Sequence, residues 1–298
     1  MTNPPENTAS FEAQFELAAG LDDVATEKGL ASGWSFFVIP EEAVAPFAVE
    51  ARNLLSKKMT EFHAKEFKHK NTDQCRAYTD FLTLIRRTAE AAPAAMLAST
   101  LNDRSWHTDL TSFAGRLANN VFTTLGITDQ GVIDGAREAA PSLFTLQRLL
   151  TSPPSTCATL RILEADETTT MAAFAARTVT VNGHSLEATR LLAMLAESYR
   201  QKQFPQSPAL RPEAINIVES SASFLVQAAD VLGNFSMNYV IRNLGPTTAG
   251  RTKKAEIFES VFRDILPHTK FAEMASLSGT EFELALKQAG ALTFVVTC

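Results

Sequence analysis

Apolar residues occupy nearly every side of the helix that the stretch 220–242 predicts. Ser220 or Ser221 can cap its start, and its only charge before Arg242 is that of Asp230. The polar side chains are spaced four, three, four and four residues apart, which places them on one helical stripe: Ser223, Gln227, Asp230, Asn234 and Asn238. The pattern predicts a buried or half-buried helix. Either the stripe faces solvent, or something positive, a metal ion or an arginine, meets Asp230.

Strand-like patterns precede this helix. Apolar and polar residues alternate over 10–17, which predicts a first strand, and a polar loop follows from Gly20 to Gly33. The apolar run 34–39 is closed by Pro40 and predicts a second strand, so the two form a hairpin. Further strands are predicted at 94–100, 158–166, 178–181 (ending in the turn Asn182-Gly183) and 214–221.

Helical spacing alternates with these strands. Helices are predicted over 41–59, 75–91, 106–150 (with breaks near Gly126 and Gly131), 186–202, 255–266 and about 279–290. Strands interleaved with helices favour an α/β domain. We expect one domain over 10–298, with a flexible tail at 1–9, a helical insertion at about 102–155 and a helical C-terminal extension at about 246–298.

Composition narrows the class of protein. With 298 residues, 45% hydrophobic and 20% charged, the chain can bury a sizeable core. No apolar run approaches bilayer length, and the N-terminus lacks a signal-peptide pattern, so we expect no membrane partner and a cytoplasmic location. Cys75, Cys157 and Cys298 are far apart and form no CxxC, which argues against a zinc cluster or a disulfide framework.

Carboxylates fall where the predicted strands or their following loops end, and more lie in the charged segment 60–70. Acidic side chains that converge from distant segments can hold Mg²⁺ or Mn²⁺ for phosphoryl transfer, because these hard ions prefer oxygen ligands. Turn and solvated-loop positions are the structural alternative for several of them. The candidates are Asp22, Asp23, Glu61, Glu66, Glu164, Asp166 and Asp230.

Other chemistries lack their motifs. The chain has no GxxxxGK[ST], no GxSxG and no GxGxxG after a strand, which argues against P-loop, serine-hydrolase and dinucleotide-binding sites. The net charge of −6 gives no global attraction to nucleic acid, so such binding needs a local basic patch. The densest patch has Phe62 and Phe67 between its basic residues. It can track a phosphate backbone or simply be a solvated helix end: Lys57, Lys58, Lys65, Lys68, His69 and Lys70.

Two short motifs and the order of elements carry a family resemblance over about 10–245. They are E-x-H-A at 61–64 and V-Q-x-A-D at 226–230. In these the chain resembles domain-of-unknown-function family 3800, which implies a ribonuclease-H-like fold, a mixed central sheet flanked by helices. That family usually has Asp-Glu-Ser-Gly directly after its first strand, whereas 20–24 here reads Gly-Leu-Asp-Asp-Val.

The resemblance also implies site residues and a function. It implies an acidic, metal-binding set of Asp22 or Asp23, Glu61, Asp166 (or Glu164) and Asp230, with Gln227 and His63 beside the metal or on the substrate. Lys65 and Lys68 are expected to bind substrate. The expected function is metal-dependent hydrolysis of phosphodiester bonds in nucleic acid, with Mg²⁺ or Mn²⁺. The alternative is a catalytically degenerate binding or regulatory protein, and convergence of the carboxylates discriminates between the two.

Overall fold

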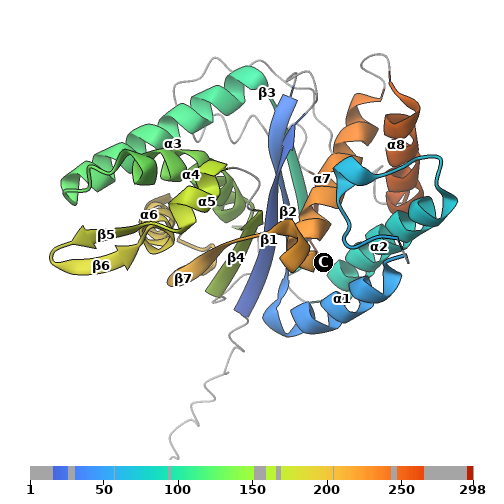
Figure 1. Cartoon of the computed structure of the whole chain (residues 1–298), viewed down its shortest axis with the longest axis horizontal. Coiled ribbons are helices and arrows are strands. Elements are labelled where there is room, and N and C mark those ends of the chain that lie inside the picture. Colours follow the sequence, from blue (N-terminus) through green and yellow to red (C-terminus); the bar gives the residue numbers. More distant parts are fainter. Residues whose placement is uncertain are drawn as a thin grey trace, which may run out of the picture.

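A mixed β-sheet forms the centre of the protein, and helices cover both of its faces (Figure 1). The computed structural model describes residues 16–25, 31–56, 58–92, 95–150, 159–165, 169–203, 205–242, 247–264 and 294–297. The strand order is β7-β4-β1-β2-β3, and β8 pairs with the outer edge of β3. The strands are β1 Glu16–Ala25, β2 Ala31–Pro40, β3 Met96–Asp103, β4 Thr159–Ala165, β7 Ala209–Val218 and β8 Phe294–Thr297.

The directions of the strands divide the sheet into two halves. β1, β2 and β3 are antiparallel neighbours, whereas β4 runs parallel to β1 and β7 runs parallel to β4. Parallel neighbours need long crossover connections, and the helices between β3, β4 and β7 supply them. The prediction of an α/β protein with a mixed sheet flanked by helices is confirmed.

The helices separate into two layers (Figure 1). α1, α2, α7 and α8 cover one face of the sheet, and α3, α4, α5 and α6 cover the other. Their bounds are α1 Glu41–Leu54, α2 Thr72–Ala91, α3 Arg104–Thr124, α4 Gln130–Leu149, α5 Thr169–Ala175, α6 Ala188–Gln203, α7 Phe224–Ile241 and α8 Ala249–Phe262. Two short 3₁₀ turns, η1 Ala64–Glu66 and η2 Ser220–Ala222, and a hairpin of β5 Thr178–Val181 with β6 His184–Glu187 complete the described elements.

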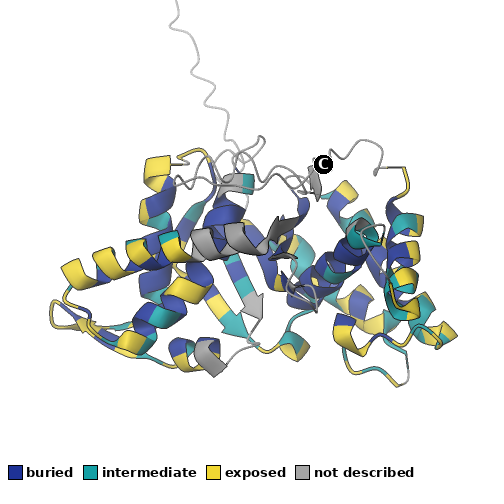
Figure 2. Cartoon of the chain, turned by 90° about the horizontal axis from the view of Figure 1, so that it is seen from above, coloured by how far each residue is buried: buried dark blue, intermediate teal, exposed yellow. Residues whose placement is uncertain are grey.

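Each face of the sheet has its own hydrophobic core, and β1 contributes to both. Leu17, Ala19 and Leu21 pack toward α4 and α6, whereas Ala18 packs toward α7. Figure 2 shows buried residues concentrated in the strands and on the inner sides of the helices. A strand covered on both faces does not need alternating polarity, which explains why residues 17–21 of β1 are all apolar or small.

Helix α7 packs unusually close to the sheet. A Cβ atom on Gly20 would lie 2.1 Å from the carbonyl oxygen of Leu225, so only glycine permits this approach. Further along α7, a Cβ atom on Gly233 would lie 2.4 Å from Val24 and 2.6 Å from Ser35. These two contacts fix which side of α7 faces the strands.

The first strand is the main difference from the sequence-based expectation. β1 continues to Ala25, so Asp22 and Asp23 lie within the strand and not in a loop after it. The sequence misleads here because Gly20 is typical of a turn, whereas in the structure it makes room for α7. The predicted strand residues 10–15 lie outside the described part of the chain, as do the tail at 1–9 and the helix at about 279–290.

Other boundaries shift by a few residues. α7 begins at Phe224 with Ser223 as its N-cap, because Ser220 and Ser221 form the preceding turn η2. α8 begins six residues before the predicted position 255, where Thr248 caps it. The strand at 178–181 and its turn are confirmed, and both turn residues have positive φ. Within the described residues, no helix is long and apolar enough to cross a membrane.

The contact at Gly20 predicts a large effect of a small change. We expect Gly20→Ala to lower the free energy of unfolding by about 3 kcal/mol, because its methyl group overlaps backbone atoms of α7 that cannot move independently. Denaturant unfolding measures this. The control is Gly250→Ala, where the new Cβ has no neighbour closer than 3.5 Å and the helix gains up to about 1 kcal/mol. Equal stability of the two variants would contradict the close packing.

Candidate functional site

The polar stripe of α7 faces away from the strands, toward the segment 58–71 and α8. Gln227 and Asp230 contact the segment, and the side-chain oxygen of Asn234 accepts a hydrogen bond of 2.7 Å from Lys254 on α8. Gln227 and Asp230 are 1% and 6% exposed, so both are removed from solvent. Buried polar side chains need hydrogen-bond partners, and the segment 58–71 supplies partners to both Gln227 and Asp230.

Three consecutive residues of that piece, Phe62, His63 and Ala64, are held by the two α7 side chains. The backbone N–H of Phe62 donates to Gln227 Oε1 (3.0 Å), and that of Ala64 donates to Asp230 Oδ2 (2.7 Å). The same carboxylate oxygen lies 3.0 Å from His63 Nδ1. The amide nitrogen of Gln227 donates in turn to the backbone oxygen of Ser220 (3.0 Å). The two motifs that carry the family resemblance therefore bind each other.

Asp230 acts as a helix cap supplied from another element. His63 occupies the N-cap position of η1, but its own side chain makes no capping hydrogen bond. Asp230 accepts from the first N–H group of this turn, which otherwise has no intrahelical partner. A carboxylate at the start of a helical turn is also favoured by the orientation of the peptide dipoles.

Side chains of α2 also contact the segment 58–71. The Tyr78 hydroxyl, on α2, donates to the backbone oxygen of His63 (2.7 Å). The Phe62 ring stacks on Phe81 with centroids 4.0 Å apart, and Tyr78 stacks on Phe235 of α7 at 5.5 Å. We call Gln227, Asp230 and Tyr78 the clamp, since they fix the backbone of residues 62–64 from α7 and α2.

The surroundings of Tyr78 keep its hydroxyl protonated. Burial raises the pKa of its hydroxyl well above the usual range, and the negative charge of Asp230 raises it further, with smaller contributions from Glu66 and Glu61. Tyr78 therefore stays neutral and keeps donating to His63. The carboxylate–imidazole pair beside it is partly accessible, with 8% of the Asp230 side chain and 21% of the His63 side chain exposed.

Of the other carboxylates in the acidic set that the resemblance implies, only Glu61 is described next to the clamp. Asp22 is 2% exposed on the face of β1 that α7 covers, whereas Asp23 is exposed. Glu61 adjoins the clamp, and Glu164 belongs to β4. Asp166 lies outside the described residues.

The carboxylates seen in the structure do not fit a shared metal ion. Within the described residues, no three His, Cys, Asp or Glu side chains are grouped closely enough to hold one. One oxygen of Asp230, Oδ2, already accepts from a backbone N–H and faces an imidazole. Among the described residues, the groups that meet this oxygen are therefore the peptide N–H of Ala64 and the ring of His63.

Sequence reasoning missed a polar row beneath α7. Asp22, Ser35 and Ser99 are direct cross-strand neighbours on β1, β2 and β3, and all three are buried. The Ser35 hydroxyl donates to the backbone oxygen of Ala98 at 3.4 Å. Their alignment depends on strand register, which no local pattern reveals.

The clamped segment carries several basic residues. Lys65, Lys68 and Lys70 are exposed. A Cβ on Gly250 would lie 3.5 Å from His69, so the first turn of α8 adjoins the same segment. Together these elements form what we call the basic surface: Lys58, Lys65, Lys68, His69, Lys70, Arg251 and Lys253.

Comparison with family models, curated proteins and solved structures finds no match. The resemblance to domain-of-unknown-function family 3800 therefore stays a prediction.

The clamp predicts which of two substitutions of Asp230 destabilises the protein more. We expect Asp230→Ala to lower the free energy of unfolding by about 3 kcal/mol, because it leaves the buried N–H of Ala64 without an acceptor. Asp230→Asn keeps one oxygen and costs about 1 kcal/mol. Denaturant unfolding measures both. Asp80→Ala, at an exposed ion pair with Arg76, is the control and changes stability by at most about 1 kcal/mol. Wild-type stability of Asp230→Ala would remove Asp230 from the clamp.

Tyr78 predicts how stability depends on alkaline pH. Its pKa is raised by folding, so above pH about 10 the unfolded chain loses the hydroxyl proton that the folded protein retains. Stability is therefore fully present below pH about 10 and falls as pH rises toward the folded pKa. We expect Tyr78→Phe to reduce the steepness of this fall, measured by denaturant unfolding across that range. A Tyr78→Phe variant that keeps the wild-type slope would refute the assignment.

Proposed function

We propose that this chain is a ribonuclease-H-like protein that binds nucleic acid through the basic surface without using Asp230 as a metal ligand. The mixed sheet supports the fold, since three antiparallel strands and two parallel strands are flanked by helices on both faces. The observation that carries the proposal is the clamp, in which Asp230 and Gln227 position a loop that presents lysines.

The clamp holds the backbone next to Lys65 and Lys68 in place. Phe62 and Ala64 are fully buried, whereas Lys65 and Lys68 next to them are exposed. Because the backbone is already ordered before a partner arrives, binding loses less conformational entropy. Both lysines are exposed to solvent, where they can meet phosphates, whose condensed counterions are released on contact. Because Phe67 and Tyr78 lie inside the protein, their rings are not exposed to stack on bases, and the basic surface would contact the phosphate backbone through charge.

Metal-dependent hydrolysis of phosphodiester bonds is the second candidate. One observation favours it: Asp22 is buried on the face of β1 that α7 covers, where a carboxylate is costly without a functional reason. It requires Asp22, Glu61, Asp166 and Asp230 to share ions. The described members of this set do not fit that arrangement.

Salt-dependent binding tests the proposal. We expect the protein to bind a short labelled single-stranded oligonucleotide with an affinity that falls as salt rises. Lys65→Ala with Lys68→Ala should reduce the slope of log affinity against log salt by about 1.4, because each lost phosphate contact on a single strand accounts for about 0.7. The matched control is Arg116→Ala with Lys202→Ala, two exposed cations on helices of the opposite face. A slope unchanged by the first pair would refute the basic surface.

Thermal unfolding with manganese separates the two candidates. If Asp230 serves the clamp, Mn²⁺ and Mg²⁺ leave the melting temperature unchanged. A rise with Mn²⁺ that Asp22→Asn abolishes would favour hydrolysis instead, since an ion that binds only the folded protein stabilises it.

A further inference from the structure

Strand β7 departs from regular pairing at its start. Leu210 pairs with Leu160 and Ile215 pairs with Ile162, so the four residues 211–214 lie opposite the single residue Arg161. Pro212 within this stretch has no N–H group to give to a neighbouring strand. The result is a large bulge, and bulges of this kind often adjoin functional sites because they redirect side chains.

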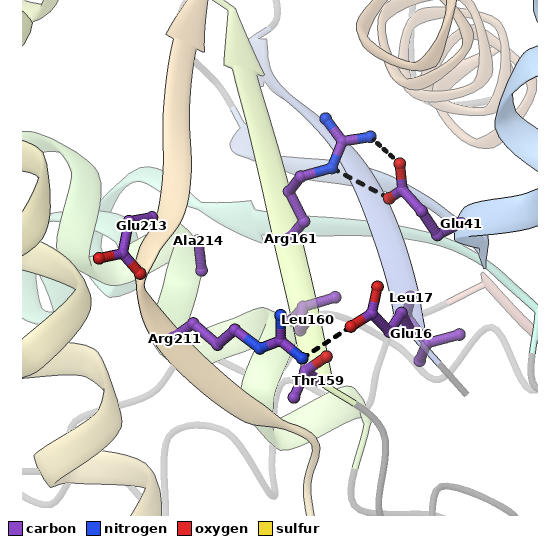
Figure 3. Close-up of a pocket in the computed structure, with 9 residues that line it drawn as sticks. All are labelled: Glu16, Leu17, Glu41, Thr159, Leu160, Arg161, Arg211, Glu213 and Ala214. Carbon is purple, nitrogen blue, oxygen red and sulfur yellow. Dashed lines mark hydrogen bonds and ion pairs between the residues drawn. The ribbon is translucent and has the colours of Figure 1, made fainter. Parts of the chain in front are cut away.

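The bulge opens a pocket of about 300 Å³ at the amino ends of β1, β4 and β7 (Figure 3). Charged side chains from four elements line it: Glu16 of β1, Glu41 of α1, Arg161 of β4, and Arg211 and Glu213 of β7. Figure 3 shows Arg211 reaching across the foot of β4 toward Glu16, while Arg161 extends toward Glu41. The volume suits a small molecule and not a polymer.

The charges in this pocket are balanced. Arg161 binds both oxygens of Glu41, at 3.0 and 2.6 Å, and Arg211 lies 2.7 Å from Glu16. Glu213 pairs with Arg190 outside the pocket lining. Counting Arg190, three positive and three negative groups give a local charge of zero. A strongly anionic ligand would meet the glutamates, and a cationic ligand would meet the arginines.

These ion pairs leave donors and acceptors for a ligand. Arg161 uses Nε and Nη2, and Arg211 uses Nη2, so Nη1 of Arg161 and both Nε and Nη1 of Arg211 have no partner within the described residues. The paired side chains are 37–61% exposed, where an ion pair contributes at most about 1 kcal/mol. A ligand can therefore insert at small cost, while the bulge offers backbone groups that do not pair with β4.

We propose that this pocket binds a small zwitterion, the carboxylate and ammonium of a free α-amino acid. The carboxylate binds the spare N–H groups of Arg211 and Arg161, and the ammonium binds Glu16. Both charges of such a ligand find opposite partners a few ångströms apart, and the net charge of the pocket does not change. This site is independent of the clamp and of nucleic-acid binding.

Three sets of probes test the site on the full chain by thermal unfolding and calorimetry. They are the free L-amino acids, their N-acetyl derivatives, which lack the ammonium, and their amides, which lack the carboxylate. We expect at least one amino acid to raise the melting temperature, and its two derivatives to bind at least tenfold more weakly. No binding by any amino acid up to about 10 mM, or equal binding by a derivative, would overturn the proposal.

Variants place the ligand in this pocket. We expect Arg211→Gln to weaken the amino acid at least tenfold with no change in the melting temperature of the free protein, because its pair is exposed. Glu16→Gln should weaken the amino acid but leave the N-acetyl probe unaffected, since that probe has no ammonium. Arg76→Gln, an exposed arginine on α2, is the control and retains wild-type affinity. Unchanged affinity in both pocket variants would overturn the assignment.

Discussion

The close contact of α7 with β1 is the constraint on which the rest of this structure depends. The backbone of α7 approaches β1 at Gly20 and the β1–β2 pair at Gly233, and neither position has room for a side chain. Two such contacts along one helix fix its distance from the sheet and its rotation about its own axis. Once the rotation is fixed, it determines which way every other side chain of the helix points.

That rotation determines what the polar stripe can contact. The side of α7 opposite the strands meets the 58–71 segment and α8, so Gln227, Asp230 and Asn234 are satisfied there. A buried carboxylate costs free energy unless charge or hydrogen bonds compensate it. Here the N–H of Ala64 and the ring of His63 share one oxygen of Asp230, and these contacts order the loop. The stability of the helix and the conformation of the loop are therefore coupled.

Much of the fold could be predicted from local patterns. Alternating strand and helix signals gave the α/β class, and Pro40 and the turn Asn182-Gly183 gave two strand ends. The predicted caps Ser220 and Ser221 did not, because Ser223 caps α7. The extent of β1 could not be predicted, because Gly20 has the composition of a turn and its role depends on a helix about 200 residues later. The bulge in β7 was also hidden, since it depends on register with β4.

The candidate site was predictable as residues but not as an arrangement. His63, Gln227 and Asp230 were selected from the sequence, and the structure brings them together. Their relation to Asp22 depends on which side of α7 meets β1, and the stripe alone does not determine this. Tyr78 and Ser35 were missed, because a core tyrosine and a strand serine carry no distinctive spacing.

A carboxylate on a buried helix supports two chemistries with the same sequence signature. Grouped with other carboxylates it holds a cation, and next to peptide N–H groups it holds the backbone. The deciding quantity is how many donors already occupy its oxygens, and Asp230 has a backbone N–H at 2.7 Å and an imidazole at 3.0 Å on one of them. The second oxygen, Oδ1, is a separate acceptor, so a cation need not displace the N–H of Ala64. A shift of the carboxylate that broke the contact with Ala64 would leave this N–H buried without a partner, which costs about 1–3 kcal/mol. In this arrangement Oδ2 of Asp230 holds the loop.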